Sequence, residues 1–210
     1  MITESRYARD ELLRIANLIL KKKKRYSGDW LLYLEMKVFI GAFLIRKLLH
    51  SNKLPDDLLT SIKLTSYLKL PGTKNTFSIR YPEDNFDGGE FRSCNLSLKA
   101  LCDQLIHSYI FHFTRTRRSM KPLGMIFTSE RKLNEKIYQI SMNQYASVLK
   151  KVALAQPNRS SSGFDPVLGR QTILQRVVRS KKDELKFLRD SKKYEDDLME
   201  KWKLYPRNPE

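Results

Sequence analysis

Cysteine is scarce: the 210 residues include only Cys94 and Cys102. These two thiols have neither the CxxC spacing nor the neighbouring histidines of a zinc site, and two cysteines are too few for a disulfide framework. Chains that keep their thiols reduced are typical of the cytosol, so we expect a cytoplasmic protein. The sequence predicts no bound metal ion and no cofactor.

Long uncharged hydrophobic runs are also lacking. The most apolar stretch, residues 30–49, contains Glu35 and Lys37 and ends with Arg46 and Lys47 before its last two leucines. A charged side chain near the centre of a membrane span costs about 2.5–3.5 kcal/mol. We therefore expect no transmembrane segment and assign this stretch to a buried core helix.

Glycine is another scarce residue, with eight in the chain. The sequence contains no GxGxxG, Walker A, HExxH or GxSxG motif, which are the usual signatures of dinucleotide binding, phosphate binding, metalloproteases and serine hydrolases. These absences favour a protein without catalytic activity.

Acidic residues are too few to balance the basic ones: 23 Asp and Glu stand against 40 Lys and Arg, and the formal net charge is +17. Such an excess repels itself in a compact fold, so an anionic partner is expected to neutralise part of it. Nucleic acid is the commonest partner of this kind. An acidic protein and an anionic membrane surface are the alternative partners. With an acidic protein as its partner, the chain would be a structural or interaction protein.

Two clusters of basic residues are the predicted contacts to nucleic acid. The first comprises Lys21, Lys22, Lys23, Lys24 and Arg25, and the second comprises Arg115, Arg117, Arg118 and Lys121. Lysine and arginine bind phosphates whatever the base sequence, and an exposed aromatic residue beside either cluster could stack on unpaired bases. The pattern indicates binding of RNA or DNA mainly through phosphate contacts, and it does not distinguish between the two.

The spacing of apolar residues predicts a mainly α fold with minor β (α+β). Helices are expected over residues 6–24, 29–50 and 96–114 and after Ser141, with Asp29 as the N-cap of the second. Short β-prone runs at residues 76–81 and 90–94, and again at 125–128 and 137–141, predict one or two short hairpins. Residues 62–70 are expected to be extended after a short helix.

The clearest linker is residues 156–163, with the sequence QPNRSSSG, because serine, glycine and proline punctuate regular structure. We therefore divide the chain into a helical core domain with small β-elements, residues 1–157, and a charged helical C-terminal extension, residues 158–210.

Two histidine pairs are candidate catalytic residues. In the first, His107 follows Asp103 by one turn of the predicted third helix, and a carboxylate at that spacing can hydrogen-bond an imidazole and raise its pKa. An imidazole base within reach of arginine side chains is what metal-independent cleavage of a phosphodiester requires. The alternative is an ordinary surface histidine without a catalytic role.

The second pair is Arg46 and His50, at the end of the predicted second helix. The segment Arg46-Lys47-Leu48-Leu49-His50 resembles the Arg and His pair of HEPN-type ribonucleases, although only three residues separate the two here, fewer than in that family. That family consists of helical bundles, and the resemblance implies a metal-independent ribonuclease whose active site forms across a homodimer. The alternative is that His50 is a cation at a helix C-terminus.

Overall fold

The structure is a computed structural model that describes residues 2–21, 26–55, 58, 61–70, 86–115, 121–133, 135–155, 157, 159–176 and 181–204. Two compact units make up the chain. The first comprises Met1–Leu48 and Leu59–Leu154, and the second comprises Leu49–Leu58 and Ala155–Glu210. Within the described ranges, no helix combines the length and the apolar character needed to cross a membrane.

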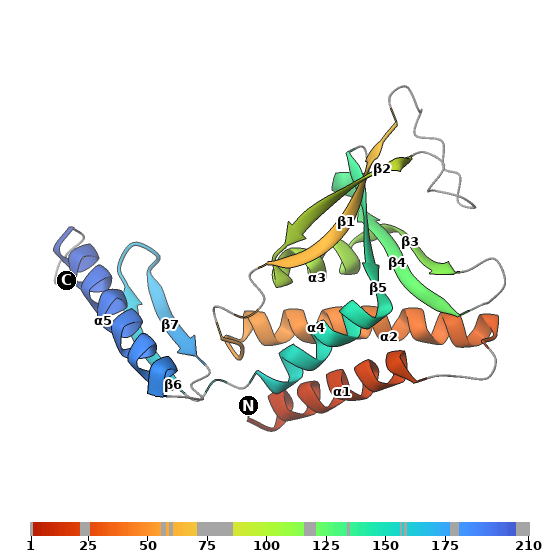
Figure 1. The fold of residues 1–210 in the computed structure, drawn as a ribbon. Helices are drawn as coiled ribbons and strands as arrows, with labels where there is room; N and C mark the ends of the chain where they lie inside the picture. The colour runs from red at the N-terminus through yellow and green to blue at the C-terminus, as the bar shows by residue number, and fades with distance from the viewer. Residues whose placement is uncertain are drawn as a thin grey trace. The chain divides into compact units, whose positions relative to one another are not determined.

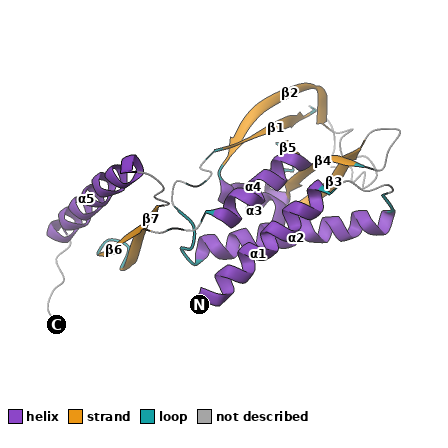
Figure 2. Ribbon diagram, turned by 60° about the horizontal axis from the view of Figure 1, so that its bottom comes forward, coloured by secondary structure: helices purple, strands orange, loops and turns teal. Residues whose placement is uncertain are grey.

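The first unit contains a five-stranded antiparallel sheet with the strand order β2-β1-β5-β4-β3 (Figure 1). Its strands are β1 (Ile62–Lys69), β2 (Phe86–Leu96), β3 (Ser108–Arg115), β4 (Pro122–Ser129) and β5 (Lys136–Ser141). Its helices are α1 (Ile2–Leu20), α2 (Gly28–His50), α3 (Leu98–Ile106) and α4 (Met142–Leu154), with a 3-10 turn, η2 (Glu130–Lys132). In the view of Figure 2, α3 and α4 lie between the β1–β2 edge of the sheet and the helices α1 and α2.

Alternation of side chains along the strands gives the sheet two faces. On one face five side chains are at most 3% exposed, namely those of Leu64, Met125, Phe127, Tyr138 and Ile140. Helix α3 packs against β3 and β4, and α4 packs against β4 and β5, so both helices help to cover this face. The core fixes the strand register, because a slip of one residue would move the apolar set to the other face.

Close packing between α2 and α4 depends on Gly41. A Cβ atom at this position would lie 3.1 Å from Oη of Tyr145 and 3.2 Å from Cδ2 of Leu149. The hydroxyl of Tyr145, which is fully buried, donates a hydrogen bond of 2.8 Å to the carbonyl oxygen of Val38. The small residue therefore lets a buried tyrosine tie the two helices together.

The predicted fold class, mainly α with one or two short hairpins, is wrong, because a five-stranded sheet is a main component of the first unit. The predicted helix over residues 96–114 ends early, and its second half forms β3. Phe111 and Phe113 share the buried face of that strand, with ring centroids 5.2 Å apart. The four-residue spacing of Leu105, Tyr109 and Phe113 imitates a helix, whereas the run of aromatic residues favours a strand that can pair with β4.

The helix predicted over residues 29–50 is confirmed as α2. Its first turn is capped by Ser27 and not by Asp29, since Oγ of Ser27 accepts a hydrogen bond of 3.2 Å from the backbone N–H of Trp30. One side of α2 is buried in the core, but the opposite side is not: Phe43 is 62% exposed. The expectation that this helix is central and enclosed holds for one side only.

The hairpin predicted from residues 125–128 and 137–141 is confirmed, because β4 and β5 pair as neighbours in the sheet. The helix predicted to begin at Ser141 is α4, and Oγ of Ser141 accepts a hydrogen bond of 3.1 Å from the backbone N–H of Gln144. Both predictions rest on contacts between residues close together in the sequence.

The remaining predicted elements have mixed outcomes. The first predicted helix, residues 6–24, corresponds to α1, which ends at Leu20, and residues 22–25 lie outside the described residues. The extended segment at residues 62–70 is β1. The β-prone run at 90–94 lies within β2 and pairs with β1, whereas the run at 76–81 lies outside the described residues.

The second unit contains β6 (Arg159–Asp165), β7 (Arg170–Arg176) and α5 (Lys181–Leu204). The expectation of helices alone is wrong here, because β6 and β7 form an antiparallel hairpin that includes part of the predicted linker. Gly169, with a φ of 62°, gives the hairpin turn a left-handed conformation. The division into residues 1–157 and 158–210 stays a prediction.

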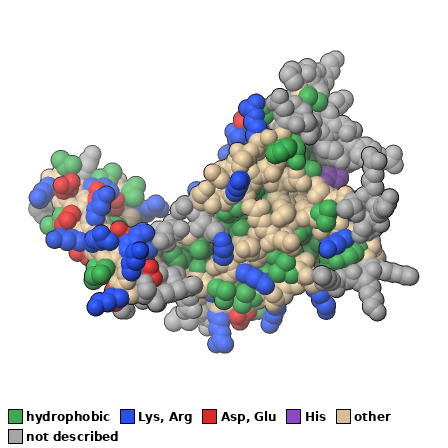
Figure 3. Space-filling view, viewed as in Figure 1, with side chains coloured by type: hydrophobic (Ala, Val, Ile, Leu, Met, Phe, Trp, Pro, Cys, Tyr) green, Lys and Arg blue, Asp and Glu red, His purple; other side chains and the backbone are tan. Residues whose placement is uncertain are grey.

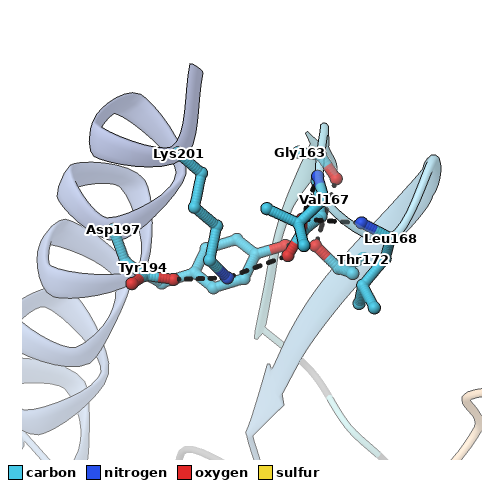
Figure 4. A network of polar contacts seen from close by, with 8 residues as sticks. Gly163, Val167, Leu168, Thr172, Tyr194, Asp197 and Lys201 are labelled. Carbon is cyan, nitrogen blue, oxygen red and sulfur yellow. Dashed lines mark hydrogen bonds and ion pairs between the residues drawn. The ribbon is translucent and has the colours of Figure 1, made fainter. Parts of the chain in front are cut away.

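Polar contacts attach α5 to the β6–β7 hairpin (Figure 4). The carboxylate of Asp165 accepts hydrogen bonds of 2.9 and 3.1 Å from two backbone N–H groups of the turn and one of 2.9 Å from Nζ of Lys201. The hydroxyl groups of Thr172 and Tyr194 lie 2.6 Å apart. These bonds fix the helix at one position along the hairpin.

Candidate functional site

A groove of about 660 Å³ lies on the side of the sheet opposite the buried face, where β5 leads into α4. All five strands line it. Five adjacent strands span four intervals of about 4.8 Å, so the strands that line the groove extend about 19 Å across the sheet. The uncharged polar side chains that line it are those of Thr65, Ser93, Thr114, Gln139, Ser141 and Gln144.

The groove has almost no charge of its own. Of the described residues that line it, Lys63 is the only basic one and none is acidic. In Figure 3, charged side chains are sparse over β1 and β5, where uncharged polar side chains and backbone predominate. A neutral or anionic ligand with many hydrogen-bonding groups suits such a lining better than a cation does.

Two glutamine amides in the groove are held in place by their neighbours. The hydroxyl of Tyr67 donates a hydrogen bond of 2.5 Å to Oε1 of Gln139. Nε2 of Gln144 donates a hydrogen bond to the carbonyl oxygen of Lys63. Each bond uses one end of an amide, which leaves the Nε2 donor of Gln139 and the Oε1 acceptor of Gln144 for further hydrogen bonds.

Gly124 allows β4 to lie close to β3 and β5 beside the groove. A Cβ atom at this position would lie 2.8 Å from the carbonyl oxygen of Ile140 and 3.0 Å from Oγ1 of Thr114. Because the first of these neighbours is backbone and cannot move aside easily, a larger residue here would distort the strands that form the groove.

Phe91 is the large aromatic residue of the groove lining. It lies on β2 opposite Tyr67 of β1, and it is 71% exposed. An exposed aromatic ring beside uncharged polar groups can stack against a flat ligand such as a base.

The second predicted basic cluster lies next to the groove. Thr114 and Gly124 line the groove, Arg115 follows the first of them, and Lys121 comes shortly before the second. Arg115 and Lys121 are both exposed. The cluster therefore begins and ends at the β3–β4 end of the groove, while Arg117 and Arg118 lie outside the described residues.

The first predicted basic cluster is described only at Lys21. This residue is exposed and directly follows the last residue of α1. Lys22, Lys23, Lys24 and Arg25 lie outside the described residues. Their part in nucleic-acid binding stays a prediction.

None of the four candidate catalytic residues, all of which the structure describes, belongs to the groove lining. Arg46 of α2 forms an ion pair with the carboxylate of Asp103 on α3. This contact joins the Arg46 and His50 pair to the Asp103 and His107 pair. His107 is the exposed C-cap of α3, and its backbone N–H donates a hydrogen bond of 3.1 Å to the carbonyl oxygen of Asp103. His50 is exposed at the last position of α2. Their catalytic roles stay predictions.

A metal site has no support among the described residues, where no group of three or more His, Cys, Asp or Glu side chains is placed to hold an ion.

Sequence reasoning did not identify the groove. The residues of the groove come from separate segments of the chain. Three such segments supply Lys63, Phe91 and the two glutamines, and strand pairing brings these segments together. One local signal was present: Ile62 and Leu64 alternate with polar residues, and in a strand that alternation places Lys63 and Thr65 on the opposite face.

Comparison with known proteins gives no match, whether the chain is compared with protein-family models, with curated protein sequences or with solved structures.

Proposed function

We propose that this protein binds nucleic acid, RNA or DNA, with the sugar–phosphate backbone held by basic residues around the groove. The observation that carries the proposal is the groove itself, which crosses five strands without an acidic side chain among its described lining. Lys63 lies on the β1 side of it, and Arg115 and Lys121 lie at the β3–β4 end.

The net charge of +17 supports the same proposal. A polyanion that neutralises part of this charge releases its bound counterions, and that release favours binding at low salt. The affinity should therefore fall linearly with salt on a double-logarithmic plot, with a slope that counts the phosphates contacted.

The test is a charge reversal at two matched positions. Lys63 and Lys99 are both exposed, but Lys63 lines the groove whereas Lys99 lies on α3, which packs against strands from the buried side. Lys63→Glu should weaken oligonucleotide binding about tenfold and lower the salt slope by about 1, and Lys99→Glu should change both much less. Equal effects of the two variants, or no binding by the wild type at low salt, would reject the proposal.

A metal-independent ribonuclease is the second candidate function. The observation that bears on it is the contact between Arg46 and Asp103, which brings together one member of each predicted catalytic pair but engages the carboxylate that would orient His107. The HEPN resemblance gives it little support, since the first unit contains a five-stranded sheet and is not a helical bundle.

The ribonuclease is tested by incubating single-stranded RNA with the protein in a chelator. Cleavage by the wild type that is lost in His107→Ala or in His50→Ala, at unchanged RNA affinity, would support it. An RNA that stays intact with the wild type would reject it and leave the binding function standing.

A further inference from the structure

We propose that the ligand of the groove is a single-stranded nucleic acid whose unpaired bases stack on Phe91 and form hydrogen bonds with Gln139 and Gln144. This inference rests on the proposed nucleic-acid binding and specifies which form of nucleic acid the groove accepts. It assigns the bases to Phe91 and the two glutamines, and the phosphates to Lys63 and to the basic β3–β4 end of the groove.

The lining of the groove fits bases better than phosphates. Phosphate sites are built from cations and backbone N–H groups, whereas the polar side chains here, apart from that of Lys63, are neutral hydroxyls and amides. An amide donor on Gln139 and an amide acceptor on Gln144 match the mixed donors and acceptors at the edge of a base. Bases within a duplex keep their Watson–Crick edges paired and expose only their groove edges, so only an unpaired strand can offer its Watson–Crick edges to a sheet.

Phe91 provides the second argument for unpaired bases. Its ring is 71% exposed at the groove, on the strand at the opposite edge of the sheet from β3. Stacking on an aromatic ring needs a base that has left its own stack, and every base has a face that can stack. A duplex that contacts the same surface through its phosphates would make no use of this ring.

The positions of these groups define a path across the strands. Phe91 lies on β2 at one edge of the sheet, and Arg115 and Lys121 lie at the β3–β4 end near the other edge. Lys63 on β1 and the two glutamines lie between them. This path crosses about 19 Å of sheet. In known single-strand-binding proteins, a four-stranded sheet holds about two or three bases, so we expect a similar number here.

The experiment compares two exposed phenylalanines. Phe91 lines the groove, and Phe43, which is 62% exposed on α2, does not. Each is changed to Ala, and the dissociation constant is measured for an unpaired oligonucleotide, for the same sequence as a duplex, and for an abasic strand of equal length. Phe91→Trp keeps an aromatic ring and serves as the rescue variant.

We expect Phe91→Ala to weaken binding of the unpaired strand about tenfold, with little effect on the duplex or the abasic strand. Phe43→Ala should leave all three affinities unchanged, and Phe91→Trp should restore binding of the unpaired strand. Equal losses for both Ala variants, or equal wild-type affinity for abasic and normal strands, would overturn the inference while the proposed function survives. Failure of the wild type to bind any of the three ligands at low salt would overturn both.

Discussion

Arg46 of α2 and Asp103 of α3 form an ion pair that joins two helices of the first unit. Their side chains are only 24% and 34% exposed, so the pair is partly shielded from solvent. The carboxylate that the sequence assigns to orienting His107 is thus engaged by a guanidinium of another helix. The pair has a structural role whether or not the histidine has a catalytic one.

The first prediction concerns the strength of that ion pair. Arg46→Ala and Asp103→Ala should each destabilise the protein, and the double variant should be less destabilised than the sum, with a coupling energy of about 1 kcal/mol. Urea denaturation of the four proteins measures this coupling. Lys132 and Glu135, an exposed pair, provide the control and should couple more weakly. A coupling energy between Arg46 and Asp103 no larger than that of the control pair would contradict the ion pair.

A second prediction concerns Cys102, which is buried on α3. Burial raises the pKa of its thiol to about 12, although the charge of Arg46 opposes the shift. Because the thiolate is the reactive form, Cys102 should resist a thiol reagent at neutral pH until the protein unfolds. In a Cys94→Ser background Cys102 is the only thiol, so the labelling rate with and without denaturant reports on it alone. Rapid labelling of the native protein would show that α3 is not packed as described.

Gly124 and Gly28 allow a matched test of the groove. Gly124→Ala places a methyl group against the carbonyl oxygen of Ile140 and should cost about 1–3 kcal/mol of unfolding free energy, as overpacking does. Gly28→Ala meets no atom within 4 Å and should be neutral or slightly stabilising. Thermal or chemical denaturation distinguishes the two. If both substitutions are equally tolerated, β3, β4 and β5 do not approach as closely as the structure has them.

The fourth prediction is a pH dependence of the second unit. The hydrogen bond from Lys201, together with two backbone N–H groups of the turn, lowers the pKa of the Asp165 carboxyl group. A carboxyl group with a lowered pKa in the folded state stabilises the fold above its ordinary pKa, and this stabilisation is lost as the pH falls through the lowered value. The unit should therefore melt at lower temperature in acid, and Asp165→Asn should lower the melting temperature at neutral pH and weaken its acid dependence.

Trp202 provides the signal for this measurement, since its ring centroid lies 5.8 Å from that of Phe164 on β6. In a Trp30→Phe background its fluorescence reports on the second unit. Asp196→Asn is the control, because Asp196 is an exposed residue of the same helix outside the network of Figure 4. An Asp165→Asn variant that melts like this control at every pH would show that the network does not stabilise the unit.

The sequence predicts the elements whose evidence is local. Helix α2 follows from an apolar run with helical spacing, and the β4–β5 hairpin follows from two short β-prone segments close together. Strand β3 was missed because Leu105, Tyr109 and Phe113 are spaced like one face of a helix. Local spacing cannot show that those residues instead pair with β4.

The candidate site was harder to predict than the fold. Thr65 and Gln139 are neighbours only because β1 pairs with β5 across a long stretch of sequence. The excess of basic residues led to two predicted clusters. Arg115 and Lys121 of one cluster lie next in sequence to, or close in sequence to, residues that line the groove. The uncharged lining and Phe91 have no signature in a single sequence, since isolated polar or aromatic residues occur on most strands.

The most direct test of nucleic-acid binding in the groove is photochemical cross-linking of a bound single-stranded oligonucleotide, followed by mass spectrometry of the linked peptides. The proposed function and the further inference together predict cross-links at Phe91 on β2 and in peptides that contain Lys63 or Gln139 on β1 and β5. Phe91→Ala should remove the link at that residue. Cross-links confined to other surfaces, such as α5 of the second unit, would contradict the placement of the nucleic acid in the groove.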